Sequence, residues 1–202
     1  MTKTLVIRSS ADAERSVSNQ LIDYYLAAQA ANDPQPQVTQ RDLDRDPVPH
    51  LTSATLAGIG RPAPETPLSQ GTRELSDTLI AEVVAADTLV IGLPMYNFGM
   101  PSTLKSWFDH VLRAGITFRY TASGPEGLVT GTRAILMVAR AGTYAAGGPD
   151  FQIGHVRTLL NFIGITDIEV VVAEGLAKGA DAAAAAIASA LAAIDNRVTV
   201  AA

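Results

Sequence analysis

One stretch, residues 89–101, limits the possible folds of this chain more than any other. It begins with the apolar run Leu89–Leu93, which includes β-branched residues and follows the charged Asp87. Such a run is typical of a strand buried on both faces of a sheet. Pro94 has no N–H to donate and ends the strand, while apolar spacings of three and four residues after Pro101 predict a helix. The intervening loop therefore lies at the carboxyl end of a central strand, where open α/β sheets bind ligands.

This loop reads Met95-Tyr96-Asn97-Phe98, so two aromatic rings and a thioether flank one amide. These side chains can wall a flat aromatic ligand, and the backbone N–H groups of the loop can reach the polar edge of that ligand. The alternative is that the side chains only cover the end of the core. The first loop of the chain bears on the choice.

The chain begins with a predicted strand, Thr4–Ile7, a polar loop, and a helix that starts near Ser18. Hydroxyls lie in this segment at Ser10, Ser16 and Ser18. A helix N-terminus has free N–H groups and a positive dipole end, which together bind phosphate, and hydroxyls there add donors. Ser16 or Ser18 could instead merely cap the helix, and the sequence leaves both roles open.

The remaining pattern alternates strands and helices. Further strands are predicted at residues 37–43, 133–139 and 168–173, and further helices at about 75–84, 151–162 and 180–194. On the fourth helix, one face is predicted to carry Phe151, His155, Leu159 and Phe162. Residues 46–67, rich in Pro, Thr and Ala, form a long excursion with a short helix predicted at 53–59.

Five strands alternating with five helices predict a parallel sheet with right-handed crossovers and helices on both faces. A phosphate-directed loop after the first strand, beside the loop of the third, fits the flavodoxin-like order 2-1-3-4-5. With 48% hydrophobic residues, the whole chain, 1–202, is expected to form one such α/β domain. Residues 115–131 exceed a minimal connection and predict two extended pieces, 115–121 and 128–131, around a Gly/Pro turn.

Composition narrows the function classes. A net charge of −5 argues against nucleic acid as a main partner, and the lack of cysteine excludes disulfides and thiolate catalysis. The spacing of His50, His110 and His155 offers no metal site. No apolar run suits a signal peptide or a membrane span, so a cytoplasmic location is expected.

Several motifs, taken in order, resemble the FMN-dependent NADH:quinone oxidoreductases, also called FMN-dependent NADH-azoreductases. The resemblance covers essentially the whole chain and is weakest between Asp44 and Leu68. The motifs are Ser9-Ser10 with Ser16-x-Ser18-Asn19, Pro94–Phe98, Gly115–Thr121, Gly124–Leu128 and Phe162–Ile165.

The resemblance implies a flavodoxin-like homodimer with one non-covalent FMN per subunit. By position, the phosphate would be held by Ser10, Ser16, Val17 and Ser18, the isoalloxazine ring by Met95, Tyr96, Asn97 and Phe98, and its pyrimidine edge by Ala139, Arg140, Ala141 and Gly142. The family usually has Ser-Arg-Gly-Gly in the last segment. This chain lacks the hydroxyl at Ala139 and gains a methyl at Ala141, where glycine could serve a positive φ.

The implied activity is two-electron reduction of quinones and azo compounds by NADH, in a ping-pong order with hydride transfer through the flavin. No catalytic acid or base is required for a quinone. Tyr120 and Phe162 are candidate walls of the substrate pocket, and core packing is the alternative role for Phe162. The opening above the flavin predicts that Tyr120 or Phe162 approaches the flavin of a second subunit.

Two other functions compete with this interpretation. A flavodoxin-type electron carrier with a protein partner needs an exposed flavin edge, which the long segment 115–131 argues against. A flavin-free, receiver-like module needs acidic residues at the ends of the first and third strands. The sequence there reads Arg8-Ser9-Ser10 and Pro94-Met95.

Overall fold

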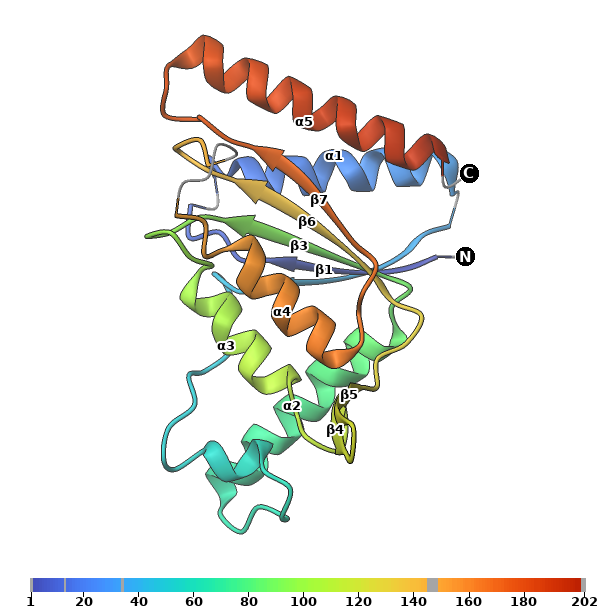
Figure 1. Cartoon of the computed structure of the whole chain (residues 1–202), viewed down its shortest axis with the longest axis vertical. Helices are drawn as coiled ribbons and strands as arrows, with labels where there is room; N and C mark the ends of the chain where they lie inside the picture. Colours follow the sequence, from blue (N-terminus) through green and yellow to red (C-terminus); the bar gives the residue numbers. More distant parts are fainter. Residues whose placement is uncertain (1, 13, 34, 145–148, 201–202) are drawn as a thin grey trace.

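A five-stranded parallel sheet forms the centre of the protein (Figure 1). The computed structural model describes residues 2–200 apart from 13, 34 and 145–148, with the backbone alone for 197–200. The strands are β1 (Lys3–Arg8), β2 (Gln37–Asp42), β3 (Thr88–Pro94), β6 (Arg133–Ala139) and β7 (Ile168–Ala173), in the spatial order β2-β1-β3-β6-β7. Because β4 and β5 form a separate hairpin, this is the predicted order 2-1-3-4-5 among the strands of the sheet.

Helices cover both faces of the sheet (Figure 1). One face carries α1 (Val17–Asn32) and α5 (Ala180–Val200), and the other carries α2 (Pro67–Ala85), α3 (Ser102–Val111) and α4 (Ile153–Ile163). Successive side chains of a strand point to opposite faces. Leu5 and Ile7 of β1 therefore pack under α2, α3 and α4, while Val6 packs under α1 and α5. Both sides of the sheet are apolar, which explains the near-continuous apolar strands in the sequence.

The local sequence explains how the helices begin. At α2, the hydroxyl of Thr66 accepts a hydrogen bond from the Ser69 N–H, and the Ser69 hydroxyl accepts one from the Thr66 N–H. With Pro67 in the first turn, this capping box starts α2 well before the apolar pattern that predicted it. At α3, Pro101 is the N-cap residue and the predicted apolar face is buried, including Leu104, Trp107, Phe108 and Val111.

Polar side chains hold the long excursion in place. Its helix, η1, is a short 3₁₀ segment at Leu56–Ile59 and not the longer helix predicted at 53–59. The guanidinium of Arg73 donates hydrogen bonds to the carbonyls of Gly58, Gly60 and Pro62. These long-range contacts have no periodic signature, which is why the sequence showed no order here.

The hairpin differs from the prediction. Its strands are β4 (Phe118–Thr121) and β5 (Gly124–Gly127), so the second extended piece predicted at 128–131 is wrong. Pro125, interpreted as part of a turn, lies in β5. A two-stranded ribbon leaves one edge of each strand unpaired, so proline costs no ladder bond there.

Two glycines join the hairpin to the end of α4. A Cβ atom added to Gly127 would lie 2.1 Å from the backbone nitrogen of Gly164, so only glycine permits this approach. The Val129 N–H also donates to the Ile163 carbonyl at 2.8 Å. The hairpin is therefore fixed to the C-terminus of α4.

Of the four residues predicted to share one face of the fourth helix, only Leu159 packs against the core. Phe151 precedes α4 and is 67% exposed, and His155 is also exposed. The buried residues of α4 are Val156, Leu160 and Ile163. Apolar residues three and four apart occur on both sides of this helix, so their spacing alone does not say which side is buried.

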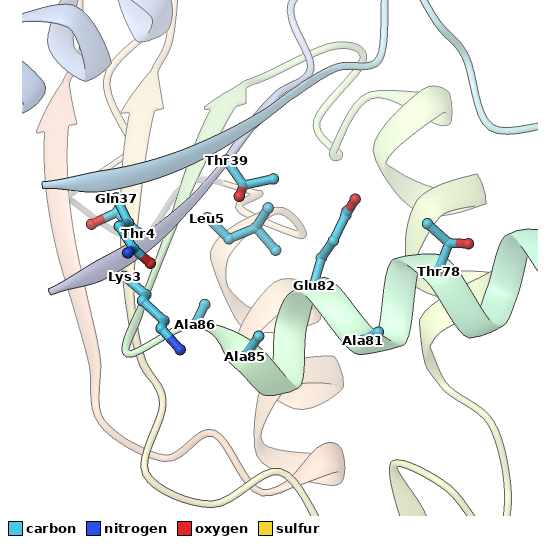
Figure 2. Close-up of a pocket in the computed structure, with 10 residues that line it drawn as sticks. All are labelled: Lys3, Thr4, Leu5, Gln37, Thr39, Thr78, Ala81, Glu82, Ala85 and Ala86. Atoms are coloured by element: carbon cyan, nitrogen blue, oxygen red, sulfur yellow. The ribbon is translucent and has the colours of Figure 1, made fainter.

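A groove of about 540 Å³ lies between β1, β2 and α2 (Figure 2). Lys3 and Gln37 open their strands and Ala85 closes α2, so the groove is at the amino ends of the strands. The predicted ligand loops are at the opposite ends. Within the described part of the chain, no helix is long and apolar enough to cross a membrane.

Candidate functional site

The three predicted ligand loops meet at the carboxyl edge of the sheet. The hydroxyls of Ser10 and Tyr96 lie 3.3 Å apart in a hydrogen bond, and the Ala11 N–H donates to the Tyr96 hydroxyl at 3.1 Å. The Met95 N–H donates to the carbonyl of Ala139 at 2.9 Å. The loop after β3 is thus joined directly to the loops after β1 and β6.

The loop after β3 is a tight turn. Tyr96 and Gly99 exchange two backbone hydrogen bonds, of 3.1 and 3.0 Å. The central residues, Asn97 and Phe98, have φ values of 48° and 69°. Positive φ at both positions is the hallmark of a type I′ turn, which tolerates asparagine well and phenylalanine poorly. Such strain is found mostly at functional sites.

The aromatic side chains of this turn face solvent. Tyr96 is 37% exposed and Phe98 is 51% exposed. Neither ring belongs to the buried core. They provide an apolar surface beside the polar groups of the first loop.

The N-terminus of α1 has the donors expected of a phosphate site. Ser16 is the N-cap, and its hydroxyl oxygen accepts from the Asn19 N–H at 3.2 Å. Ser16 is thus a cap, as one alternative held, but its oxygen also lies 3.1 Å from that of the buried Ser18. The N–H groups of Val17 and Ser18 have no acceptor within the helix. No acidic side chain in the first turn opposes the positive end of the helix dipole.

The guanidinium of Arg140 points into the protein. It is almost fully buried, and it donates to Gln152 Oε1 at 3.1 Å and to Asp150 Oδ2 at 2.7 Å. Glu174 lies 3.7 Å away, and the ring of Tyr144 is 5.4 Å from the guanidinium carbon. The guanidinium is therefore bonded within the protein and is not turned toward the edge of the sheet where the ligand loops lie.

The carboxylate of Asp150 is stabilised in its charged form. Burial alone would raise its pKa, but hydrogen bonds from the Gln152 N–H and the Arg140 guanidinium outweigh that effect. The pKa of Asp150 is therefore lowered. Its Oδ1 atom also accepts from the N–H of Ile153, so Asp150 caps α4.

The loop after β6 accommodates both of its alanines. Among the described residues other than glycine, positive φ values occur at Asn97 and Phe98 alone. Ala141 therefore has no need for the backbone freedom of glycine. Its carbonyl accepts from the Ala177 N–H at 3.0 Å, and its methyl group is exposed.

The predicted walls of the substrate pocket, Tyr120 and Phe162, do not lie at the ligand loops. Tyr120 is 64% exposed, whereas Phe118 is buried against Phe162, with ring centroids 4.5 Å apart. Phe118 and Phe162 are thus partners within one chain, which favours the packing role that was the alternative for Phe162. Phe162 is half-buried and lines a groove of about 360 Å³ with Pro125 and Gly127 of the hairpin.

A helix length separates these walls from the ligand loops (Figure 1). The 10 residues of α3 run from the loop after β3 toward the hairpin, a rise of roughly 15 Å. Likewise, α4 begins beside Leu93 and ends at the hairpin. One subunit does not bring Tyr120 and Phe162 to its own Met95–Phe98 loop.

Comparisons with known proteins agree with this arrangement. A family model described as a flavodoxin-like fold matches residues 2–198. The FMN-dependent NADH:quinone oxidoreductase of Shigella flexneri is 48% identical over 200 residues, which is 98% of this chain and 99% of that protein. A second such enzyme, from Pseudomonas fluorescens, is 47% identical over 182 residues, covering 90% and 92% of the two chains. The chain belongs to the FMN-dependent NADH:quinone oxidoreductase family.

Solved structures show the same fold for this oxidoreductase-family chain. The azoreductase of Bacillus anthracis superposes with a TM-score of 0.89 at 29% identity, over 98% of this chain and 99% of that one. An FMN-dependent NADH-azoreductase from the same species, solved in complex with FMN, has a TM-score of 0.88 at 26% identity, over 98% of each chain.

Sequence reasoning on this family member missed three residues at or near the site. Ser9 donates to the Gly92 carbonyl at 2.6 Å, and Gln152 joins two of the loops. Arg61, from the excursion, lies over the Tyr120 ring with 5.8 Å between guanidinium carbon and centroid. Ser9 adjoins a predicted residue, but the other two reach the site through long-range contacts, for which one sequence gives no signal.

Proposed function

We propose that this chain binds FMN at the carboxyl ends of β1, β3 and β6 and uses NADH to reduce quinones and azo compounds. The observation that carries the proposal is the joining of three loops through the Ser10–Tyr96 and Met95–Ala139 hydrogen bonds. The relatives named as FMN-dependent NADH:quinone oxidoreductases, at about 47% identity, support the activity.

The donors present fit the phosphate of FMN. The free N–H groups of Val17 and Ser18 would bind its oxygens at the positive end of α1. The Ser16 hydroxyl accepts from the Asn19 N–H, so its proton can be donated either to Ser18 or to a phosphate oxygen. Ser10, bonded to Tyr96, would add a further hydroxyl from the preceding loop.

The turn after β3 fits the flat ring. The apolar and aromatic side chains Met95, Tyr96 and Phe98 would contact the isoalloxazine face, with Asn97 at the same turn. The backbone of Ala139, Arg140, Ala141 and Gly142 would meet the pyrimidine edge. When bound, FMN supplies the hydride chemistry, taking a hydride from NADH and delivering it to the acceptor.

The residues of the chain position the reactants. We assign no side chain as acid or base, because water can protonate a reduced quinone. His50 and His155 are exposed, and His110 is buried on α3 with its ring nitrogen bonded to the Ser106 carbonyl. Only one face of the flavin would be open above the turn. NADH and the acceptor would therefore bind at that face one after the other, which is a ping-pong order.

The chain would act as a homodimer. A helix length separates Tyr120 and Phe162 from the ligand loops of their own subunit, so a second subunit is needed to bring them there. Ile116, between α3 and the hairpin, is 48% exposed and adds an apolar side chain to this surface. A two-fold interface would use this surface twice and complete two sites.

Steady-state kinetics test the proposal. The purified protein should be yellow, and NADH varied at several fixed quinone concentrations should give parallel double-reciprocal lines. Intersecting lines would show that both substrates bind at the same time and would refute a shared binding site. A flavodoxin-type carrier would bind FMN yet oxidise NADH negligibly with a quinone as acceptor.

A further inference from the structure

The carbonyls at the end of β3 are bonded by side chains from other elements. The Ser9 hydroxyl donates to the Gly92 carbonyl, and the Gln152 Nε2 atom donates to the Leu93 carbonyl at 3.1 Å. Both side chains are buried. The next residue, Pro94, opens the loop that we assign to the flavin ring.

The other end of the same amide reaches the loop after β6. Gln152 Oε1 accepts from Arg140 Nε at 3.1 Å. Arg140 is itself fixed by its backbone, because its N–H donates to the Ala173 carbonyl at 2.9 Å and its own carbonyl accepts from the Leu176 N–H at 3.1 Å. One fully buried side chain thus connects the end of β3, next to its loop, with the loop after β6.

The helix start is arranged around this connection. Gln152 is the N-cap residue of α4, but its side chain makes no capping bond. Asp150 takes over that role, accepting from the N–H groups of Gln152 and Ile153 through Oδ1 while its Oδ2 accepts from Arg140. The Gln152 amide is therefore free of the helix and committed to the two loops.

We propose that Gln152 is a positioning residue for the flavin, which holds the loops 95–98 and 139–142 at a fixed separation. The inference rests on the proposed function, since those loops are assigned to the face and to the pyrimidine edge of the FMN ring system. Gln152 is fully buried with both ends of its amide bonded, so it acts through Leu93 and Arg140 and not by contact with the ligand. It prepares the two loops for the ligand and reduces the ordering cost of binding.

Two variants distinguish the two hydrogen bonds of the Gln152 amide, to the Leu93 carbonyl and from Arg140. Gln152→Met keeps the length of the side chain and removes both bonds. Gln152→Glu keeps an acceptor for Arg140 but has no donor for the Leu93 carbonyl. Gln29→Met is the matched control, because Gln29 donates to the Thr4 hydroxyl at 3.0 Å at the other end of β1.

Two measurements on the full chain read out the role. In FMN titrations of the flavin-stripped protein, Gln152→Met should weaken affinity about tenfold, the equivalent of one buried hydrogen bond. Amide hydrogen exchange without flavin should accelerate in both loops for Gln152→Met, and in the loop after β3 alone for Gln152→Glu. Gln29→Met should change neither quantity.

The outcomes are distinct. If both Gln152 variants bind FMN like the wild type and their loops exchange at wild-type rates, the positioning role is refuted. If the wild type itself fails to bind FMN, the proposed function fails, while the exchange rates still test the connection. If Gln152→Met does not fold, Gln152→Glu decides through the loop after β3.

Discussion

The carboxyl-end loops and the hairpin end of α4 are held in different ways. The loops are joined to one another by hydrogen bonds such as that of Ser10 with Tyr96, and the buried Gln152 adds one to Leu93 at the end of β3. The hairpin is fixed at its base by Gly127, but its ring Tyr120 is 64% exposed and has only Phe118 and Arg61 recorded beside it among the described residues.

One subunit would therefore supply the FMN contacts by itself but would not supply the walls of its own substrate pocket. The phosphate and ring contacts assigned above come from loops that already meet within one chain. The aromatic walls lie at the far ends of α3 and α4 and would act on the neighbouring subunit. Cofactor affinity and acceptor turnover should therefore respond to different substitutions.

The largest effect is expected for Tyr120→Ala combined with Phe162→Ala. Loss of both walls should lower kcat/KM for a quinone by about 100-fold, because misplacing the acceptor by an ångström has effects of that size. FMN affinity should stay within about twofold of the wild type, a small change on the scale of one hydrogen bond. Leu56→Ala, at an exposed residue of the excursion, is the control.

Subunit mixing shows on which chain the walls act. A subunit with Ser16→Ala and Asn97→Ala is mixed with one carrying Tyr120→Ala and Phe162→Ala, and heterodimers are verified by native mass spectrometry. Each heterodimer should contain one site with intact FMN contacts and intact walls, so activity should exceed that of either parent. Verified heterodimers without recovery would mean that each subunit supplies its own walls.

The next effect concerns the phosphate donors. A hydrogen bond to a charged oxygen contributes about 1.5–3 kcal/mol, so Ser10→Ala or Ser16→Ala should weaken FMN binding by roughly one to two powers of ten. Turnover at saturating FMN should stay near normal. Ser53→Ala, at an exposed serine of the excursion, should bind FMN like the wild type. Unchanged affinity in both Ser10 and Ser16 variants would leave these serines as structural caps.

A smaller effect is expected at the strained turn. Asn97 has a φ of 48°, which a β-branched residue adopts at a cost of about 1–2 kcal/mol. Asn97→Val should therefore weaken FMN binding by about tenfold, whereas Asn97→Gly keeps the backbone and should change it by less than about threefold. Titrations of the two variants side by side give the comparison. Equal losses would mean that the Asn97 side chain, and not the turn, holds the flavin.

The smallest effect is a pH dependence at Asp150. Its pKa in the folded chain lies below the ordinary value of 3.8, so its charged form stabilises the fold above that pH and the contribution disappears as pH falls through the folded value. The difference in unfolding free energy between wild type and Asp150→Asn should therefore shrink below pH 3.8. The carboxylate is partly exposed, so this change should stay under about 1 kcal/mol. A constant difference across that range would contradict the assignment.

Periodicity was enough to predict most of the fold. The strands β1, β3, β6 and β7 match their apolar runs, and the order of the sheet followed from the loop chemistry after β1 and β3. The predicted loops of the site also meet, because parallel strands bring their carboxyl ends to one edge. These features depend on local patterns that a single sequence contains.

The sequence was not enough where apolar spacing fitted more than one face of a helix, or where contacts join residues far apart in the chain. Apolar spacing on α4 fitted two faces, and only packing against the sheet selects the one with Val156 and Leu160. Pro125 was assigned to a turn because proline usually ends a strand, yet it lies in β5 of the two-stranded hairpin, where one edge is unpaired. The inward direction of Arg140 depends on Asp150 and Gln152, which no periodicity connects to it.

The contact between Gly127 and Gly164 fixes the base of the hairpin, while the tip of the hairpin can vary. Any side chain at Gly127 would collide with the backbone of Gly164, so the joint itself tolerates no variation. The tip residues Ala122 and Ser123 are exposed and carry no such restriction. Libraries that seek new acceptor ranges can therefore exchange the tip freely, provided both glycines are kept.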